Sequence, residues 1–111
     1  MAAPGYLLIL LAAAVLEAGG DALVRLGLHT TSWLVRGSFF ALGAVVLFAY
    51  GLTVNAPAWD FGKLLGVYVT LFFITAQAIN WWVFGVAPSL PIIIGGGLIL
   101  AGGLLITFWQ A

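Results

Sequence analysis

Three charged side chains recur at four-residue intervals in the first apolar stretch of the chain: Glu17, Asp21 and Arg25. Residues four and eight apart share one face of a helix, so these three form a single stripe. An acid or base at the centre of a membrane span costs about 2.5–3.5 kcal/mol on insertion scales and usually marks a functional site. We therefore expect the stripe to face protein or a water-filled cavity.

Glu17 is the residue of the stripe best suited to chemistry. It lies in the middle of the apolar run, and Arg25 is two helical turns away, beyond direct reach. A carboxyl group that is poised between its protonated and ionised forms can exchange a proton for a cation, as acids do in proton relays of membrane transporters. The alternative is a permanently protonated Glu17 that hydrogen-bonds a neighbouring helix.

Asp21 and Arg25 have a second interpretation. They lie one turn apart, and charges inside membranes commonly pair with one another. We expect them to form a structural ion pair, with Asp21 also close enough to Glu17 to take part in proton or substrate binding.

The composition dictates what kind of element must hold this stripe. The 111 residues are 65% hydrophobic and 5% charged, whereas soluble domains carry roughly 25% charged residues. The apolar runs are continuous, which excludes the alternating pattern of a membrane barrel. We predict an all-α membrane protein: a single four-helix transmembrane bundle with helices over 6–28, 33–53, 60–85 and 90–109, surrounded by the lipid bilayer.

Several function classes lack support in the sequence. The net charge is zero, which gives no reason to expect nucleic-acid binding, and there is no cysteine for disulfides or thiolate metal sites. His29 stands alone in a predicted loop, so we expect no metal site and no cofactor. No arrangement of nucleophile and base is present, and we expect no enzyme. The first run has no preceding Lys or Arg and is interrupted by Glu17, which favours a permanent helix over a cleaved signal.

The predicted helix ends carry their own signals. Asp60 is placed to cap the third helix, and Pro91 suits the first turn of the fourth. Tryptophans and tyrosine lie near the ends, as in the aromatic belts of membrane proteins: Tyr6, Trp33, Trp59, Trp81, Trp82 and Trp109. Two arginines flank the first loop and one lysine the second, so insertion in one orientation and insertion in both remain open.

The third predicted helix carries a stripe of polar or small residues at helical spacing: Lys63, Gly66, Thr70, Gln77 and Asn80. Such residues face the bundle interior. Thr70 could line a substrate path beside Glu17, or the stripe could supply hydrogen bonds between helices.

The fourth predicted helix carries small residues at spacings of four and seven and almost no polar atoms. Small residues allow helix backbones to approach closely in membranes. We expect Gly95, Gly97, Ala101 and Gly102 to form an oligomer contact, with packing inside one chain as the alternative.

Together these motifs resemble the small multidrug resistance transporters. The run Glu17–Arg25, EAGGDALVR, is similar to the signature of that family's first helix. Trp82–Gly85, WVFG, followed by Leu90-Pro91, resembles its passage into the fourth helix. The glycine spacing over Gly95–Gly102 resembles its dimerising helix, and Pro57 matches the proline before its third helix. The resemblance covers nearly the whole chain.

The resemblance implies a homodimer of antiparallel, dual-topology chains in a bacterial inner membrane that exports small cations in exchange for protons. The first three helices of both chains would form the chamber, and the fourth helices would form the contact. Glu17 would bind the proton or the cation.

The chain also departs from that family, which implies a divergent member of the wider drug/metabolite transporter superfamily. The family's tyrosine and tryptophan on the third helix have no direct counterpart; the segment 60–66 reads DFGKLLG. Tyr68 is a candidate displaced equivalent and thus a candidate binding residue, and Asp21 occupies a usually uncharged position. Two other functions stay open: a non-transporting accessory subunit of a larger membrane complex, and movement of lipid-linked substrates.

Overall fold

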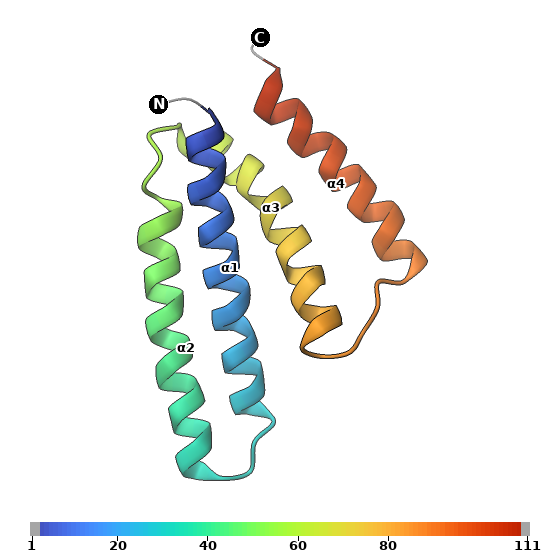
Figure 1. Ribbon diagram of the computed structural model, residues 1–111. Coiled ribbons are helices and arrows are strands. Elements are labelled where there is room, and N and C mark those ends of the chain that lie inside the picture. Colours follow the sequence, from blue (N-terminus) through green and yellow to red (C-terminus); the bar gives the residue numbers. More distant parts are fainter. Residues whose placement is uncertain (1–2, 110–111) are drawn as a thin grey trace.

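The computed structural model describes residues 3–109, which form four α-helices joined by short loops. The helices are α1 (Ala3–Leu28), α2 (Trp33–Val54), α3 (Phe61–Trp82) and α4 (Leu90–Phe108). All four are long and apolar enough to cross a membrane. They run alternately up and down, so the start of α1 and the end of α4 lie at one end of the bundle (Figure 1). The predicted all-α, four-helix transmembrane fold is confirmed.

The observed helix ends follow local chemistry. The Asp60 carboxylate accepts a hydrogen bond from the backbone N–H of Lys63 at 3.0 Å, which confirms the predicted cap of α3. Pro91 lies in the first turn of α4, as expected. The predicted range 60–85 is too long, because α3 ends at Trp82. Gly85 takes a positive φ of 70°, which a helix cannot contain, and the Val86 N–H donates back to the Asn80 carbonyl.

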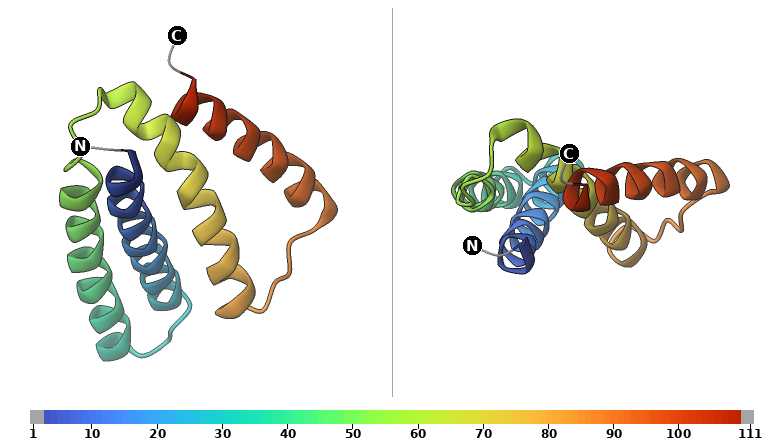
Figure 2. Two further views of the ribbon diagram at one scale, coloured as in Figure 1. Left: turned by 45° about the horizontal axis from the view of Figure 1, so that its top comes forward. Right: turned by 90° about the horizontal axis from the view of Figure 1, so that it is seen from above.

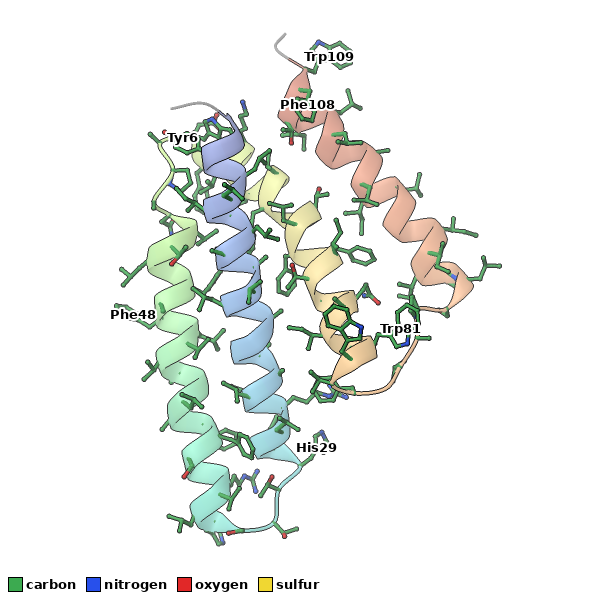
Figure 3. All side chains as sticks on the ribbon, viewed as in Figure 1. Tyr6, His29, Phe48, Trp81, Phe108 and Trp109 are labelled. Atoms are coloured by element: carbon green, nitrogen blue, oxygen red, sulfur yellow. The ribbon has the colours of Figure 1, made fainter. Side chains whose placement is uncertain are left out.

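Aromatic side chains mark the two ends of the bundle. Tyr6 packs edge-on against Trp59 with 5.0 Å between ring centroids, and Trp109 lies at the same end (Figure 3). Trp33 and Trp82, on helix ends toward the first and third loops, are 84% and 83% exposed. Exposed tryptophans at both ends of apolar helices are placed to meet lipid headgroups.

Glycines set the close approach of α1 and α2. A β-carbon at Gly43 would lie 2.9 Å from Val24 Cγ2 and 3.3 Å from the carbonyl oxygen of Gly20. A β-carbon at Gly27 would lie 2.7 Å from the Phe40 ring. The two helices therefore touch nearly backbone to backbone, as small residues permit in membranes.

Gly43→Ala should destabilise the bundle by about 1–3 kcal/mol, the usual cost of adding a methylene to a filled interface. The Gly20 carbonyl is backbone and can yield only if the helices separate. Gly37→Ala is the matched control, since its added β-carbon on α2 would meet nothing within 4 Å. Thermal unfolding of both variants in detergent checks this. Equal melting temperatures for the two would contradict the close contact.

The buried core lies between α1 and α3 toward the end that holds the start of α1. Its α1 members are small, Ala13 and Ala14 beside Leu10, and its α3 members are Leu64, Val67 and Tyr68. Val54, at the end of α2, completes this core. Away from it α1 and α3 diverge, as the left view of Figure 2 also shows. The fold thus packs one end of this helix pair tightly and leaves the other end open.

The fourth helix packs on α3 through two of its glycines. A β-carbon at Gly96 would clash with the Phe73 ring, and one at Gly103 would clash with the Thr70 side chain. In Figure 1, α4 lies at the edge of the bundle beside α3. Its opposite face is left for lipid or for another chain.

Candidate functional site

Glu17 lies in the middle of α1, and a tyrosine from another helix holds its side chain. The Tyr68 hydroxyl donates a hydrogen bond to Glu17 Oε1 at 2.6 Å and also lies 3.5 Å from the Ala13 carbonyl oxygen. The shorter distance is within the range of a hydroxyl–carboxylate hydrogen bond. Glu17 is half-buried rather than sealed in the core. The acid is therefore oriented by a neighbouring helix and keeps part of its surface exposed in the single chain.

Two neighbouring aromatic rings, those of Phe72 and Tyr50, pack against the ring that carries this hydroxyl. Tyr68 is buried, with 4% of its surface exposed. Its ring stacks on Phe72, one turn along α3, with 6.0 Å between centroids, and lies 5.7 Å from the ring of Tyr50 on α2. Offset aromatic pairs at such distances are stabilising. Three helices thus meet around the Glu17 carboxyl.

The Glu17–Tyr68 contact can be measured by a double-mutant cycle with Glu17→Ala and Tyr68→Phe. Hydrogen bonds between membrane helices average about 0.6 kcal/mol and reach about 1.7 kcal/mol in such cycles. We expect a coupling free energy in the upper part of that range, because the bond is short and its donor is buried. Unfolding in mixed micelles provides the free energies. Strictly additive effects of the two substitutions would contradict the contact.

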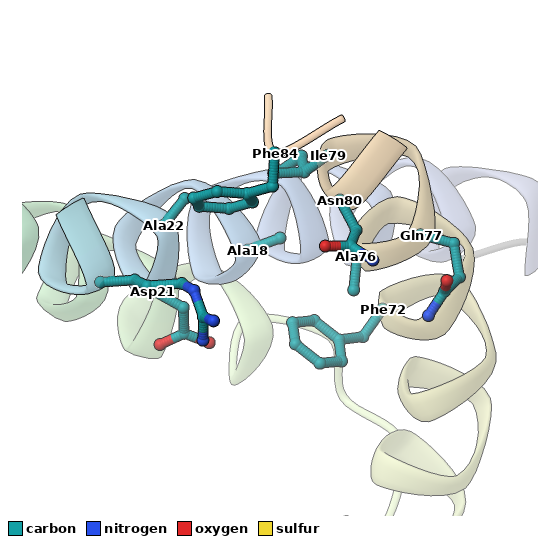
Figure 4. Close-up of a pocket in the computed structure, with 10 residues that line it drawn as sticks. Ala18, Asp21, Ala22, Phe72, Ala76, Gln77, Ile79, Asn80 and Phe84 are labelled. Atoms are coloured by element: carbon teal, nitrogen blue, oxygen red, sulfur yellow. The ribbon is translucent and has the colours of Figure 1, made fainter. Parts of the chain in front are cut away.

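A groove of about 390 Å³ opens between the diverging halves of α1 and α3. Figure 4 shows acidic, amide and aromatic side chains around it. Its walls combine an acid and a base, two amides and two aromatic rings: Asp21, Arg25, Gln77, Asn80, Phe72 and Phe84. The groove thus gathers several polar side chains between two apolar helices.

Asp21 and Arg25 both line this groove, and both are exposed in the single chain. The guanidinium carbon of Arg25 lies 5.6 Å from the centroid of the Phe84 ring, within cation–π range. The structure describes both side chains, and no ion pair joins Asp21 to Arg25 in it. The predicted structural ion pair thus stays a prediction and is not an observed contact.

The groove and the Glu17 carboxyl lie next to each other along both helices. Ala18, which follows Glu17, lines the groove, and Asp21 lies one turn beyond Glu17 on α1. Phe72, one turn beyond Tyr68 on α3, also lines the groove. The Glu17–Tyr68 pair therefore marks the boundary between the packed core and the open groove.

Thr70 does not join this site. Its hydroxyl donates to the Ile99 carbonyl on α4 at 3.5 Å, and it packs against Gly103. Gly66 likewise faces Ile106 of α4. The expected position of Thr70 beside Glu17 is not observed, because α3 turns its Leu64–Tyr68–Phe72 face toward α1 and its Gly66–Thr70 face toward α4.

The small residues of α4 divide between two faces. A β-carbon at Gly95, Gly97 or Gly102 would meet nothing within 4 Å, and Ala101 is exposed. These four, predicted as a dimer contact, make no close contact with α3, which Gly96 and Gly103 make instead. Gly97 does border a groove with Phe73 and Gln77 of α3. Their role in a dimer stays a prediction.

Sequence reasoning missed Tyr50 and Phe72 as members of the site. Phe72 follows Tyr68 by four residues, a spacing that could have identified it once Tyr68 was a candidate. Tyr50 is one of few polar side chains in α2, which is the weaker signal. Within residues 3–109, no group of three His, Asp or Glu side chains is arranged to hold a metal ion.

The chain has clear relatives among bacterial membrane proteins. It is 32% identical over 100 residues to a UPF0060 membrane protein of Clostridium perfringens, a match that covers 88% of this chain and 87% of the relative. A UPF0060 membrane protein of Herpetosiphon aurantiacus is 32% identical over 73 residues, 64% of this chain and 66% of the relative. One of Clostridium beijerinckii is 28% identical over 104 residues, 92% of this chain and 91% of the relative.

No protein-family model matches the chain, and no solved structure matches it. Four apolar spanning helices and these relatives identify a multi-pass integral membrane protein. With a relative above 30% identity that it covers over most of its length, the chain belongs to the UPF0060 membrane protein family.

Proposed function

We propose that this protein is a proton-coupled transporter of small organic cations, in which Glu17 binds either a proton or the cation. The observation that carries the proposal is the Tyr68 hydroxyl at 2.6 Å from a half-buried acid in mid-membrane, one turn from a polar groove. Ionisable groups in membrane spans are expensive and typically lie on ion or substrate paths.

The exchange works by competition for one carboxylate. A cation that enters through the groove meets Asp21 and then Glu17, and the Glu17 proton leaves as the cation binds. A proton that returns from the other side displaces the cation. Tyr68 keeps the carboxyl oriented by donating to one oxygen, which leaves the other free for the proton or the cation.

A second copy of the chain completes the site in this proposal. Asp21 and Arg25 are exposed in the single chain although they belong to a membrane span, and charges do not face lipid without cost. On α4, Gly97 and Gly102 have open space where a β-carbon would stand, which leaves room for close approach of another helix. A dimer would bring two Glu17 carboxyls to one chamber, where they titrate as a coupled pair.

The resemblance to small multidrug resistance transporters supports the same function and an antiparallel arrangement of the two chains. The motifs Glu17–Arg25 and Gly95–Gly102 carry that resemblance. The UPF0060 relatives, known by name as membrane proteins, are compatible with it and specify no solute.

Reconstituted vesicles test the proposal. Propyltrimethylammonium carries a permanent charge and does not cross lipid unaided, so its uptake reports on the protein. Vesicles with an acidic interior should accumulate it as protons leave, and collapse of the pH gradient by an ionophore should stop uptake. Uptake that does not depend on the pH gradient would contradict the proposal. So would the absence of uptake above that of protein-free vesicles for a panel of organic cations.

Purification in mild detergent addresses the accessory-subunit alternative. A transporter should purify as a dimer of this chain that is active by itself. Stoichiometric co-purification of other membrane subunits, with no uptake by the isolated dimer, would favour the accessory role.

A further inference from the structure

The groove beside Glu17 carries an acid and a base that occupy one wall without pairing with each other. Asp21 and Arg25 lie four residues apart on α1, about 6 Å along the helix axis. Both are exposed, and Arg25 lies over the Phe84 ring rather than on Asp21. The wall therefore presents a negative and a positive group, each with capacity to bind a ligand.

We propose that this groove binds a zwitterionic solute, one that carries an ammonium group and a carboxylate or phosphate a few carbon atoms apart. The ammonium would lie against Asp21 and the Phe72 ring, and the anionic group against the Arg25 guanidinium. The amides of Gln77 and Asn80 on the opposite wall can hydrogen-bond either end. The inference rests on the proposed transport function and specifies its substrate class.

A simple cation fits this groove less well than a zwitterion. Arg25 would repel a positive charge held on the same wall. A ligand that also brings an anionic group turns that repulsion into a charge-assisted contact. The groove volume of about 390 Å³ suits a ligand of this size.

The order of the charges along α1 gives the ligand a direction. Arg25 lies in the last turn, near the loop, and Asp21 lies one turn closer to Glu17. The anionic group of the ligand would stay toward the loop and its ammonium would point toward Glu17. This places the cationic end where the proton is exchanged.

Two sources can supply this chemistry, a free zwitterion or the headgroup of phosphatidylethanolamine. Binding to the purified dimer is measured by calorimetry with two probes, trimethylammoniopropionate and propyltrimethylammonium, which differ only by a carboxylate in place of a methyl group. Lipid binding is measured as phosphatidylethanolamine retained after exchange into phosphatidylglycerol micelles. Arg25→Gln is compared with Arg36→Gln, an arginine on α2 that lies over Trp33 and Phe40.

We expect the zwitterion to bind more tightly than the matched cation. Arg25→Gln should weaken zwitterion binding by about 10- to 100-fold, the usual effect of losing a hydrogen bond to a charged group. The same substitution should not weaken binding of the cation. Arg36→Gln should change neither. Phosphatidylethanolamine retention that depends on Arg25, without binding of the soluble zwitterion, supports the same site with a lipid headgroup as its ligand.

Equal affinity for the two soluble probes, together with equal lipid retention by wild type and Arg25→Gln, would overturn the inference. The proposed function is tested separately, by cation uptake and by the dependence of that uptake on Glu17. Uptake that persists while the zwitterion preference is absent would leave the transporter standing and remove only this substrate class.

Discussion

Glu17→Gln should reduce pH-driven cation uptake to the level of protein-free vesicles. The amide keeps the shape of the side chain and an oxygen that can accept the Tyr68 hydrogen bond, but it cannot take up or release a proton. The fold should therefore survive while the exchange stops. Initial uptake rates at matched protein density in the membrane, with equal melting temperatures as the check on folding, measure the effect.

The control for Glu17→Gln is Asp60→Asn, the same change from acid to amide at the start of α3. Asp60 caps a helix outside the proposed path, and asparagine caps helices equally well. Its uptake should match wild type. Undiminished uptake by Glu17→Gln would remove Glu17 from the mechanism. An equal loss of uptake in both variants would mean that replacing either acid impairs insertion into the membrane.

The double substitution Gly97→Leu and Gly102→Leu should convert the proposed dimer to single chains and abolish the proposed cation uptake. An added β-carbon at either position would meet nothing within 4 Å in the chain itself. Leucine at these positions would keep a partner helix from close approach. Light scattering of the purified protein in detergent measures the mass of the particle and thus the number of chains. Vesicle assays measure the loss of cation uptake.

Gly37→Leu provides the matched control, because Gly37 also lies in open space, on α2. This variant should remain a dimer. The α4 double variant should still unfold in a cooperative thermal transition as a single chain. Gly96 and Gly103, which pack on α3, are unchanged in it. A dimer that persists with both leucines in place would place the contact on another face.

The sequence was sufficient to predict the helices and the stripe on α1. Continuous apolar runs of about 20 residues can only be spanning helices, and the four-residue spacing of Glu17, Asp21 and Arg25 requires a shared face. The cap at Asp60 and the place of Pro91 follow from local backbone chemistry, and both are observed. These features depend on residues close together in the chain.

The neighbours of each face depend on how the helices rotate against one another, which spacing alone does not determine. Thr70 and Tyr68 are two residues apart on α3, and both were candidates for the site. Tyr68 belongs to the buried cluster that holds Ala13, Ala14 and Leu64 and donates to Glu17, whereas Thr70 donates to Ile99 of α4. The same applies to α4, where Gly102 and Gly103 are neighbours in sequence yet face open space and α3 respectively.

Arg25 shows a further limit of reasoning from spacing. Its distance of four residues from Asp21 permits an ion pair, but Phe84, in the loop after α3, offers the guanidinium an aromatic face. That neighbour is 59 positions away in the chain, next to Gly85 with its positive φ. The groove and its free charges are therefore products of tertiary structure.

Proton release on cation binding is the most direct test of the central claim. When propyltrimethylammonium is added to the purified protein in weakly buffered detergent solution, the wild type should release protons in an amount that saturates with the cation. Glu17→Gln should release none, and Asp60→Asn should match wild type. Cation binding without proton release by the wild type, or equal release from Glu17→Gln, would contradict the account.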